Sequence, residues 1–210
     1  MNKFIGITGT GRCGTKYAAK YFREVFKLDV KHEVYGKDGI SSLYLANDPH
    51  YEKFVYRTFL NGKMPCIFHQ VREPMHVISS LRKRDFIRFN MLSLPELDVD
   101  DLLVRSAIFY LHWNRKISKI FKKAFRYKVE DMRKPYIIKR FAKILEVPYN
   151  RKLVQRAQHI DTTINTSYHW NNSAHTQHKK YKHVFTLDEL KERNIEVGNK
   201  IELMAKEFGY

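Results

Sequence analysis

The stretch KFIGITGTGRCGTK, residues 3–16, decides the fold. It opens with a short apolar run and continues into a loop with glycines at positions 9, 11 and 14. Apolar residues then recur at helical spacing from Tyr17 to Phe26. A strand, a glycine loop and a helix in this order let several backbone N–H groups point at one anion, while the helix dipole adds positive potential. The stretch therefore predicts a phosphate or sulfate site at the end of a strand.

The rest of the chain repeats the alternation of strands and helices. The spacing of apolar residues predicts strands at residues 28–34, 65–71 and 125–129, and helices at residues 75–84, 99–124 and 136–145. Residues 40–61 have a mixed pattern, helical in pieces, and Thr186 with Glu189 forms a capping box ahead of a C-terminal helical region. The alternation predicts an α/β fold with a central parallel β-sheet flanked by helices, in a single domain of residues 1–210.

Composition limits the class of partner. The chain has 39 Lys and Arg residues against 22 Asp and Glu residues, and the resulting charge of +17 favours anionic partners. Because no secretory apolar region and no run of about 18 apolar residues occurs, we expect a cytoplasmic protein without membrane contact. Cys13 and Cys66 are expected to be free thiols. No Cys/His spacing resembles a structural zinc site, so no metal is expected.

Charged side chains accompany the glycines of the loop. Arg12 within the loop and Lys16 in the first helical turn supply positive charge from two sides. The glycine spacing also fits a kinase phosphate loop, but the Lys-Ser/Thr order of that loop is reversed here as Thr15-Lys16. A shift of one position rotates a helical side chain by about 100°. A divergent nucleotide or small-molecule kinase, dependent on ATP and magnesium, remains an alternative, as does a glycine-rich connection with solvated charges.

A second candidate anion site follows the predicted strand 65–71. Arg72 stands at the strand end, Pro74 comes two residues later and Ser80 eight residues after Arg72. The guanidinium of Arg72 offers a rigid fork to a phosphate, and the Ser80 hydroxyl can donate to the same group. Two separate anion sites predict a ligand with two separated phosphates. Arg72 is alternatively an ion-pair partner of Glu73 or Glu130.

The two motifs together resemble those of the sulfotransferase superfamily that uses 3′-phosphoadenosine 5′-phosphosulfate (PAPS). Residues 11–16 are similar to the family's 5′-phosphosulfate loop, with Cys13 in place of the usual serine or glycine, and residues 72–80 are similar to its 3′-phosphate segment. The resemblance spans residues 4–148. It implies a P-loop-like sulfotransferase fold, PAPS as sulfuryl donor, 3′-phosphoadenosine 5′-phosphate (PAP) as product and no required metal. It implies donor contacts from Gly11, Arg12, Cys13, Gly14, Thr15, Lys16, Tyr17, Arg72 and Ser80.

Sulfuryl transfer needs positive charge near the leaving phosphate and a base for the acceptor hydroxyl. Arg12 is expected to stabilise the sulfuryl and leaving groups, and Lys16 the 5′-phosphate. Several branches of the family place a glutamate at the end of the second strand, so the resemblance implies Glu33 as the base, with the neighbouring His32 as the alternative. Adjacent strand residues face opposite ways, so only one of the two is expected in the site unless the strand has ended.

Residues 164–184 lose the apolar periodicity and are rich in Asn, Ser, His and Lys, which predicts a long loop or lid. Lys179 and Lys180 in this segment are expected to bind the donor. The acceptor is expected to be a small molecule or a carbohydrate, and the oligomeric state is left open. Segments able to line the acceptor pocket carry Tyr35, Asp38, Ser41, Ser42, His69, His112 and Trp113. A basic nucleic-acid-binding module, which would not require the paired loops, is the remaining alternative; a sulfotransferase is not expected to bind nucleic acid.

Overall fold

The computed structural model describes residues 2–81, 95–161 and 183–210. Within these residues it contains a five-stranded sheet in the order β2-β3-β1-β4-β5. Every pair of neighbouring strands is parallel. The strands are β1 (Lys3–Thr8), β2 (Val30–His32), β3 (Gly39–Ser41), β4 (Met64–Val71) and β5 (Phe125–Lys128). The predicted α/β fold with a central parallel sheet flanked by helices is confirmed.

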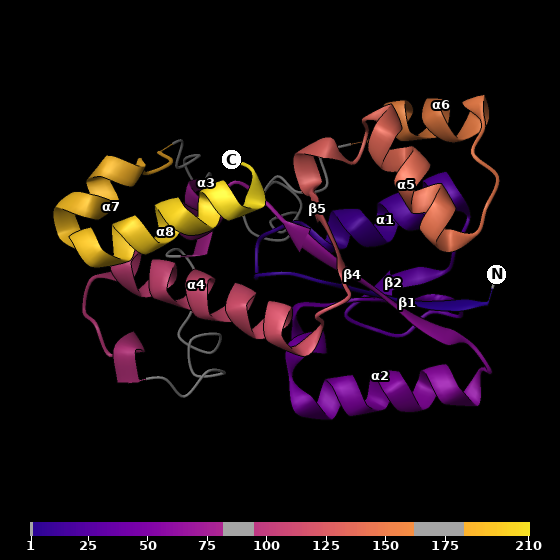
Figure 1. Ribbon diagram of the computed structural model, residues 1–210, viewed down its shortest axis with the longest axis horizontal. Helices are drawn as coiled ribbons and strands as arrows, with labels where there is room; N and C mark the ends of the chain where they lie inside the picture. The colour runs from indigo at the N-terminus through magenta and orange to yellow at the C-terminus, as the bar shows by residue number, and fades with distance from the viewer. Residues whose placement is uncertain (1, 82–94, 162–182) are drawn as a thin grey trace, which may run out of the picture.

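Helices cover both faces of the sheet. α1 and α5 lie with α6 on one side and α2 on the other, while α4, α7 and α8 form a group on the side toward which the strands run (Figure 1). The helices are α1 (Thr15–Phe26), α2 (Asp48–Leu60), α3 (Pro74–Leu81), α4 (Leu102–Ile120), α5 (Pro135–Leu145), α6 (Arg151–His159), α7 (Leu187–Arg193) and α8 (Ile195–Phe208). None of the helices in the described part of the chain is long and apolar enough to cross a membrane.

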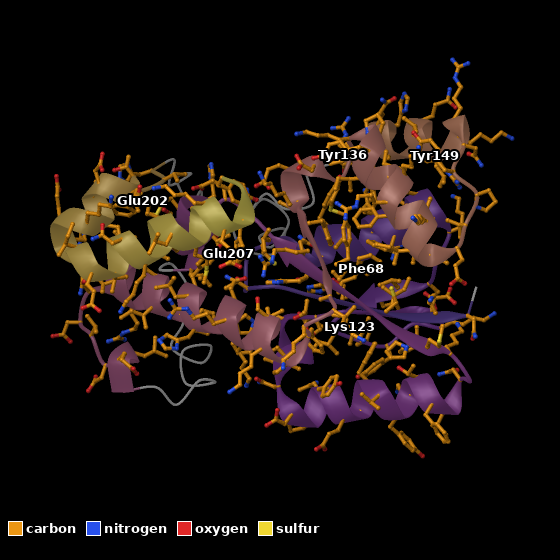
Figure 2. All side chains as sticks on the ribbon, viewed as in Figure 1. Phe68, Lys123, Tyr136, Tyr149, Glu202 and Glu207 are labelled. Carbon is orange, nitrogen blue, oxygen red and sulfur yellow. The ribbon has the colours of Figure 1, made fainter. Side chains whose placement is uncertain are left out.

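Alternation along β1 divides the interior into two hydrophobic clusters. Ile5 and Ile7 pack with α1 and α5, whereas Phe4 belongs to the cluster on the opposite face. Between the sheet and α5, Phe68 of β4, which Figure 2 labels, lies 5.2 Å from the Phe22 ring and 5.5 Å from the Phe141 ring. Each buried phenylalanine of this kind contributes about 2 to 3 kcal/mol to folding. This aromatic layer packs α1 and α5 against β4.

Several predicted elements differ in their bounds. β2 ends at His32 rather than at residue 34, and α4 spans Leu102–Ile120 rather than 99–124 because Asp101 caps it, accepting from the Leu103 and Val104 N–H groups. The predicted helix 75–84 is present up to Leu81, and its last three residues lie outside the described ones. β3 and α6 were not predicted.

Other local predictions are confirmed. Thr186 and Glu189 form the capping box, with the Glu189 carboxylate accepting from the Thr186 N–H at 2.7 Å. Cys13 and Cys66 are both free and buried.

The chain leaves the two neighbouring strands β1 and β4 toward opposite faces of the sheet. β1 leads into α1, which packs in the cluster of Ile5 and Ile7, whereas β4 leads through α3 to α4, which packs in the cluster of Phe4. In open parallel sheets, ligands bind outside the carboxyl ends of the strands where connections diverge in this way. The fold therefore points to the loops after β1 and β4.

Candidate functional site

The loop between β1 and α1 makes a tight turn over residues 10–13. The Cys13 N–H donates to the Thr10 carbonyl at 3.1 Å, and Arg12 at the third position of the turn has a φ of 73°. Gly14 follows with a φ of 102°, at the N-terminus of α1. Gly9 is equally constrained, because a β-carbon there would lie 2.3 Å from the Gln70 carbonyl oxygen. The glycines thus permit a loop that lies close against β4 and opens at the start of a helix.

Left-handed backbone marks two of the predicted catalytic residues. Among the described residues other than glycine, Arg12, Lys27, Glu33 and Glu146 have positive φ values. Lys27 and Glu146 end α1 and α5, where this conformation is common. Arg12 and Glu33 do not end a helix. Such a conformation costs a non-glycine residue of the order of 1 to 3 kcal/mol and persists at functional sites that the surroundings hold in place.

The two predicted anion motifs meet. The Arg12 Nε donates to the Ser80 Oγ at 2.8 Å, and the Arg72 Nη1 donates to the Arg12 carbonyl at 3.5 Å. The alternative ion pair also forms, since the Arg72 Nε lies 3.9 Å from the Glu130 Oε1. Both side chains of that pair are partly exposed, so it contributes little stability. Arg72 therefore faces both the glycine loop and an acidic neighbour.

The end of β2 lies against the other side of the loop. The His32 Nε2 is 3.2 Å from the Thr15 Oγ1 and 3.5 Å from the Glu33 Oε1. The Ser42 hydroxyl donates to the Glu33 Oε2, and the Glu33 N–H donates to the Ser41 carbonyl at 3.0 Å. Because β2 has ended at His32, strand alternation no longer separates the two side chains. Both candidate bases lie together, and about one third of each remains exposed, at 34% and 31% of the side chain.

A buried polar network behind the loop was not predicted. The Gln70 Nε2 donates to the Cys13 carbonyl at 2.6 Å, and the Tyr127 hydroxyl donates to the Gln70 Oε1 at 2.9 Å. The Asn114 Nδ2 donates to the Thr10 Oγ1 at 2.9 Å. Hydrogen bonds of this kind satisfy groups whose burial would otherwise cost free energy. The network fixes the loop at both ends of its turn.

His69 completes this network on the side of α4. Its Nε2 lies 3.0 Å from the Asn114 Oδ1, and its ring lies 6.0 Å from that of Phe208. Burial lowers the pKa of His69 to about 4, against the opposing effect of the Asn114 hydrogen bond. The imidazole is therefore neutral near pH 7 and donates to Asn114.

Three further residues of the predicted loop site differ in exposure. Burial raises the pKa of the Cys13 thiol to about 12, so the thiol stays protonated and is no nucleophile. Lys16 is exposed on α1. The Tyr17 hydroxyl is buried and has no hydrogen-bond partner among the described residues. The Tyr17 ring lies 6.2 Å from that of Tyr21, in the hydrophobic cluster that α1 shares with α5.

The residues suggested for an acceptor pocket have separate roles. Trp113 and His69 lie in the interior, with Trp113 stacked on Phe109 at 5.6 Å. Asp38 pairs with Lys63 at 2.9 Å. Burial alone would raise the Asp38 pKa, but the hydrogen bond from the Asp29 N–H and the hydrogen bond and charge of Lys63 outweigh it and lower the pKa. Residues 164–182, with Lys179 and Lys180, lie outside the described ones. Across the described parts of the chain, no three or more His, Cys, Asp or Glu side chains form a group able to hold a metal ion.

Comparisons with known proteins give one weak similarity. No protein-family model matches the chain, and no curated protein matches it. Among solved structures, the chain is similar to a sulfotransferase domain from the curacin biosynthetic pathway, with a TM-score of 0.46 and 14% sequence identity over 74% of this chain and 78% of that one.

Proposed function

We propose that the protein transfers a sulfuryl group from PAPS to a hydroxyl or amine of a small molecule or carbohydrate. One observation carries the proposal: the Arg12 Nε lies 2.8 Å from the Ser80 Oγ, so the loop after β1 and the segment after β4 meet at the carboxyl ends of adjacent strands. PAPS bears a 5′-phosphosulfate and a 3′-phosphate. Two neighbouring anion motifs match a ligand with two such groups better than they match a ligand with a single phosphate.

The residues present fit the donor. The glycine loop and the N-terminus of α1 suit the 5′-phosphosulfate, because backbone N–H groups and the helix dipole both favour an anion there. Arg72 and Ser80 suit the 3′-phosphate, through a planar guanidinium and a hydroxyl donor. Arg12 belongs to the glycine loop and contacts Ser80, so its guanidinium can stabilise the negative charge that develops on the leaving phosphate.

Glu33 is the proposed base. The Ser42 hydroxyl stabilises one carboxylate oxygen, and the other oxygen faces His32. As the acceptor oxygen forms its bond to sulfur, its proton passes to Glu33. The bond from sulfur to the bridging oxygen breaks, and PAP leaves with the electron pair beside the guanidinium of Arg12. His32 is held by both Thr15 and Glu33 and is the alternative base.

Calorimetric titration with PAP tests the donor. We expect the wild-type protein to bind PAP, and Arg72→Ala to weaken binding about 10- to 100-fold, because a hydrogen-bonded charge is lost. Arg23→Ala is the matched control: Arg23 is exposed on α1, and its loss should leave the affinity unchanged. Absence of PAP binding together with binding of ATP and magnesium would replace the proposal with a kinase. A radiolabelled donor tested on pooled sugars, polyols and phenols then identifies the acceptor class.

A further inference from the structure

Gln70 is a buried amide whose orientation is fixed by its neighbours. It is the penultimate residue of β4 and is 0% exposed. The Cys13 carbonyl oxygen can only accept, so the NH₂ end of the Gln70 amide must face it, at 2.6 Å. The Gln70 Oε1 is then left to accept from the Tyr127 hydroxyl, at 2.9 Å. One side chain thus links β5 to the backbone of the glycine loop.

The bond to Cys13 also sets the direction of the next N–H group. The described residues contain no cis peptide, and a trans peptide places its C=O and N–H on opposite sides. Because the Cys13 carbonyl points at Gln70, the N–H of Gly14 points away from Gln70. Glycine at position 14, with a φ of 102°, would allow this peptide to rotate at little cost. The backbone by itself therefore does not hold the N–H in place.

A second amide supports the same turn from the opposite face of the sheet. His69 and Gln70 are consecutive on β4, so their side chains face opposite ways. His69 contacts Asn114, which donates to Thr10, while Gln70 donates to Cys13. The two ends of the turn are fixed independently, and Arg12 between them is held in its left-handed conformation.

We propose that Gln70 is a positioning residue: its hydrogen bond to the Cys13 carbonyl turns the Gly14 N–H outward as a donor to the bound anion. Gln70 touches no substrate and acts through the Cys13–Gly14 peptide. The identity of the anion rests on the proposed function, whereas the orientation of the peptide does not. A loop N–H aimed at a charged oxygen is worth about 10- to 100-fold in affinity.

Gln70→Met tests this role, because methionine keeps the length of the side chain but cannot donate to Cys13. We expect its affinity for PAP, measured by calorimetry, to fall about 10- to 100-fold. Thr58→Val is the matched control: Thr58 is 3% exposed, and its hydroxyl donates to the Phe54 carbonyl within α2. This variant also loses a buried hydrogen bond, yet it should bind PAP as the wild type does. Urea unfolding of both variants separates lost stability from lost binding.

A spectroscopic signature reports on the peptide itself. Cys13-Gly14 is the one Cys-Gly pair in the sequence, so ¹³C-carbonyl cysteine with ¹⁵N-glycine selects the Gly14 amide signal alone. In the wild type this signal should shift when PAP or inorganic sulfate is added. In Gln70→Met it should start from a different position and shift much less, whereas Thr58→Val should match the wild type.

The two ligands separate the two proposals. If PAP fails to bind the wild type but sulfate shifts Gly14 in the wild type and not in Gln70→Met, the positioning role stands and the donor is wrong. If Gln70→Met binds within twofold of wild type and its Gly14 signal shifts equally, Gln70 is merely structural. If neither ligand shifts Gly14 in the wild type, this N–H is not an anion donor and the inference is overturned.

Discussion

Left-handed backbone occurs at both ends of the strands, for different reasons. We call the side of the sheet where the strands begin its amino edge, and the side where they end its carboxyl edge. At the amino edge, Lys27 and Glu146 are left-handed where α1 and α5 end, and Glu146 pairs with Lys3 at the start of β1 at 3.1 Å. At the carboxyl edge, Arg12 and Glu33 are left-handed without ending a helix. Ser80 contacts Arg12, and Ser42 contacts Glu33, so other segments of the chain hold both residues. Termination of a helix explains the first pair, and we propose that ligand binding explains the second.

Glu33→Gln should have the largest effect on the carboxyl edge. The amide keeps the shape of the side chain and can accept from Ser42, but it cannot take a proton from the acceptor. We expect sulfuryl transfer, followed with radiolabelled donor, to fall about 1,000-fold, as for loss of a general base. PAP affinity should stay within a few-fold of wild type.

His32→Ala is the companion variant, because His32 lies 3.5 Å from the Glu33 Oε1. If Glu33→Gln keeps its activity and His32→Ala loses it, the base is His32. Near-wild-type turnover in both variants would remove general-base catalysis from the end of β2, and the two edges would then differ less than we propose.

Arg12→Gly separates strain from function within one residue. Glycine relieves the positive φ of 73° but removes the guanidinium that contacts Ser80. The free energy of unfolding should change by less than about 1 kcal/mol, because relief of strain offsets the lost hydrogen bond. Transfer should nevertheless fall about 1,000-fold, as for a lost transition-state donor. Unfolding in urea and radiolabelled turnover measure the two effects; equal losses in both would mean that Arg12 is structural.

The spacing of apolar residues explains which parts of the fold could be predicted from the sequence. The strand–loop–helix order around residues 3–26 was predicted because apolar periodicity is a property of neighbouring residues. β3 was missed because it has three residues and begins at Gly39, the last residue of a glycine-containing break, so too few positions remain to show alternation. α6 was missed because its apolar residues are only Leu153, Val154 and Ala157, and three positions within five residues do not define a helical stripe. Both elements depend on neighbours distant in the chain.

The residues of the candidate site likewise divide into those that the sequence predicted and those that it did not. The residue types of Arg12, Arg72 and Ser80 lie within short motifs, and the structure brings these three residues together. Gln70 and Asn114 could not be found, because their bonds to the loop join residues 57 and 104 positions apart. For Gln70, the one available signal was its place beside His69 near the end of β4, a strand that is otherwise apolar.

His69, near the carboxyl edge, makes the free energy of unfolding dependent on pH. Its pKa falls from about 6.5 in the unfolded chain to about 4 in the fold because burial disfavours the imidazolium, so the unfolded state binds the proton first as pH falls. Stability is complete above pH 6.5 and is lost toward pH 4. Between pH 6.5 and 5 the wild type should lose about 2 kcal/mol more than His69→Asn, which cannot titrate. Urea unfolding at both pH values gives this difference, and parallel losses would show that His69 is already accessible to protons.

Lys27→Gly should have the smallest effect, and it tests the amino edge. Lys27 has a φ of 60° and is exposed at the end of α1, so glycine relieves strain without removing a buried contact. The free energy of unfolding should rise by about 0.5 to 1 kcal/mol, which for a chain of this size raises the melting temperature by about 1 to 4 °C. Turnover should not change. Because Arg12→Gly alters the backbone in the same way, a loss of turnover in Arg12→Gly alone would assign the effect to the guanidinium and its place at the carboxyl edge. A loss in both variants would instead mean that left-handed backbone at either edge supports activity through the rigidity of the fold.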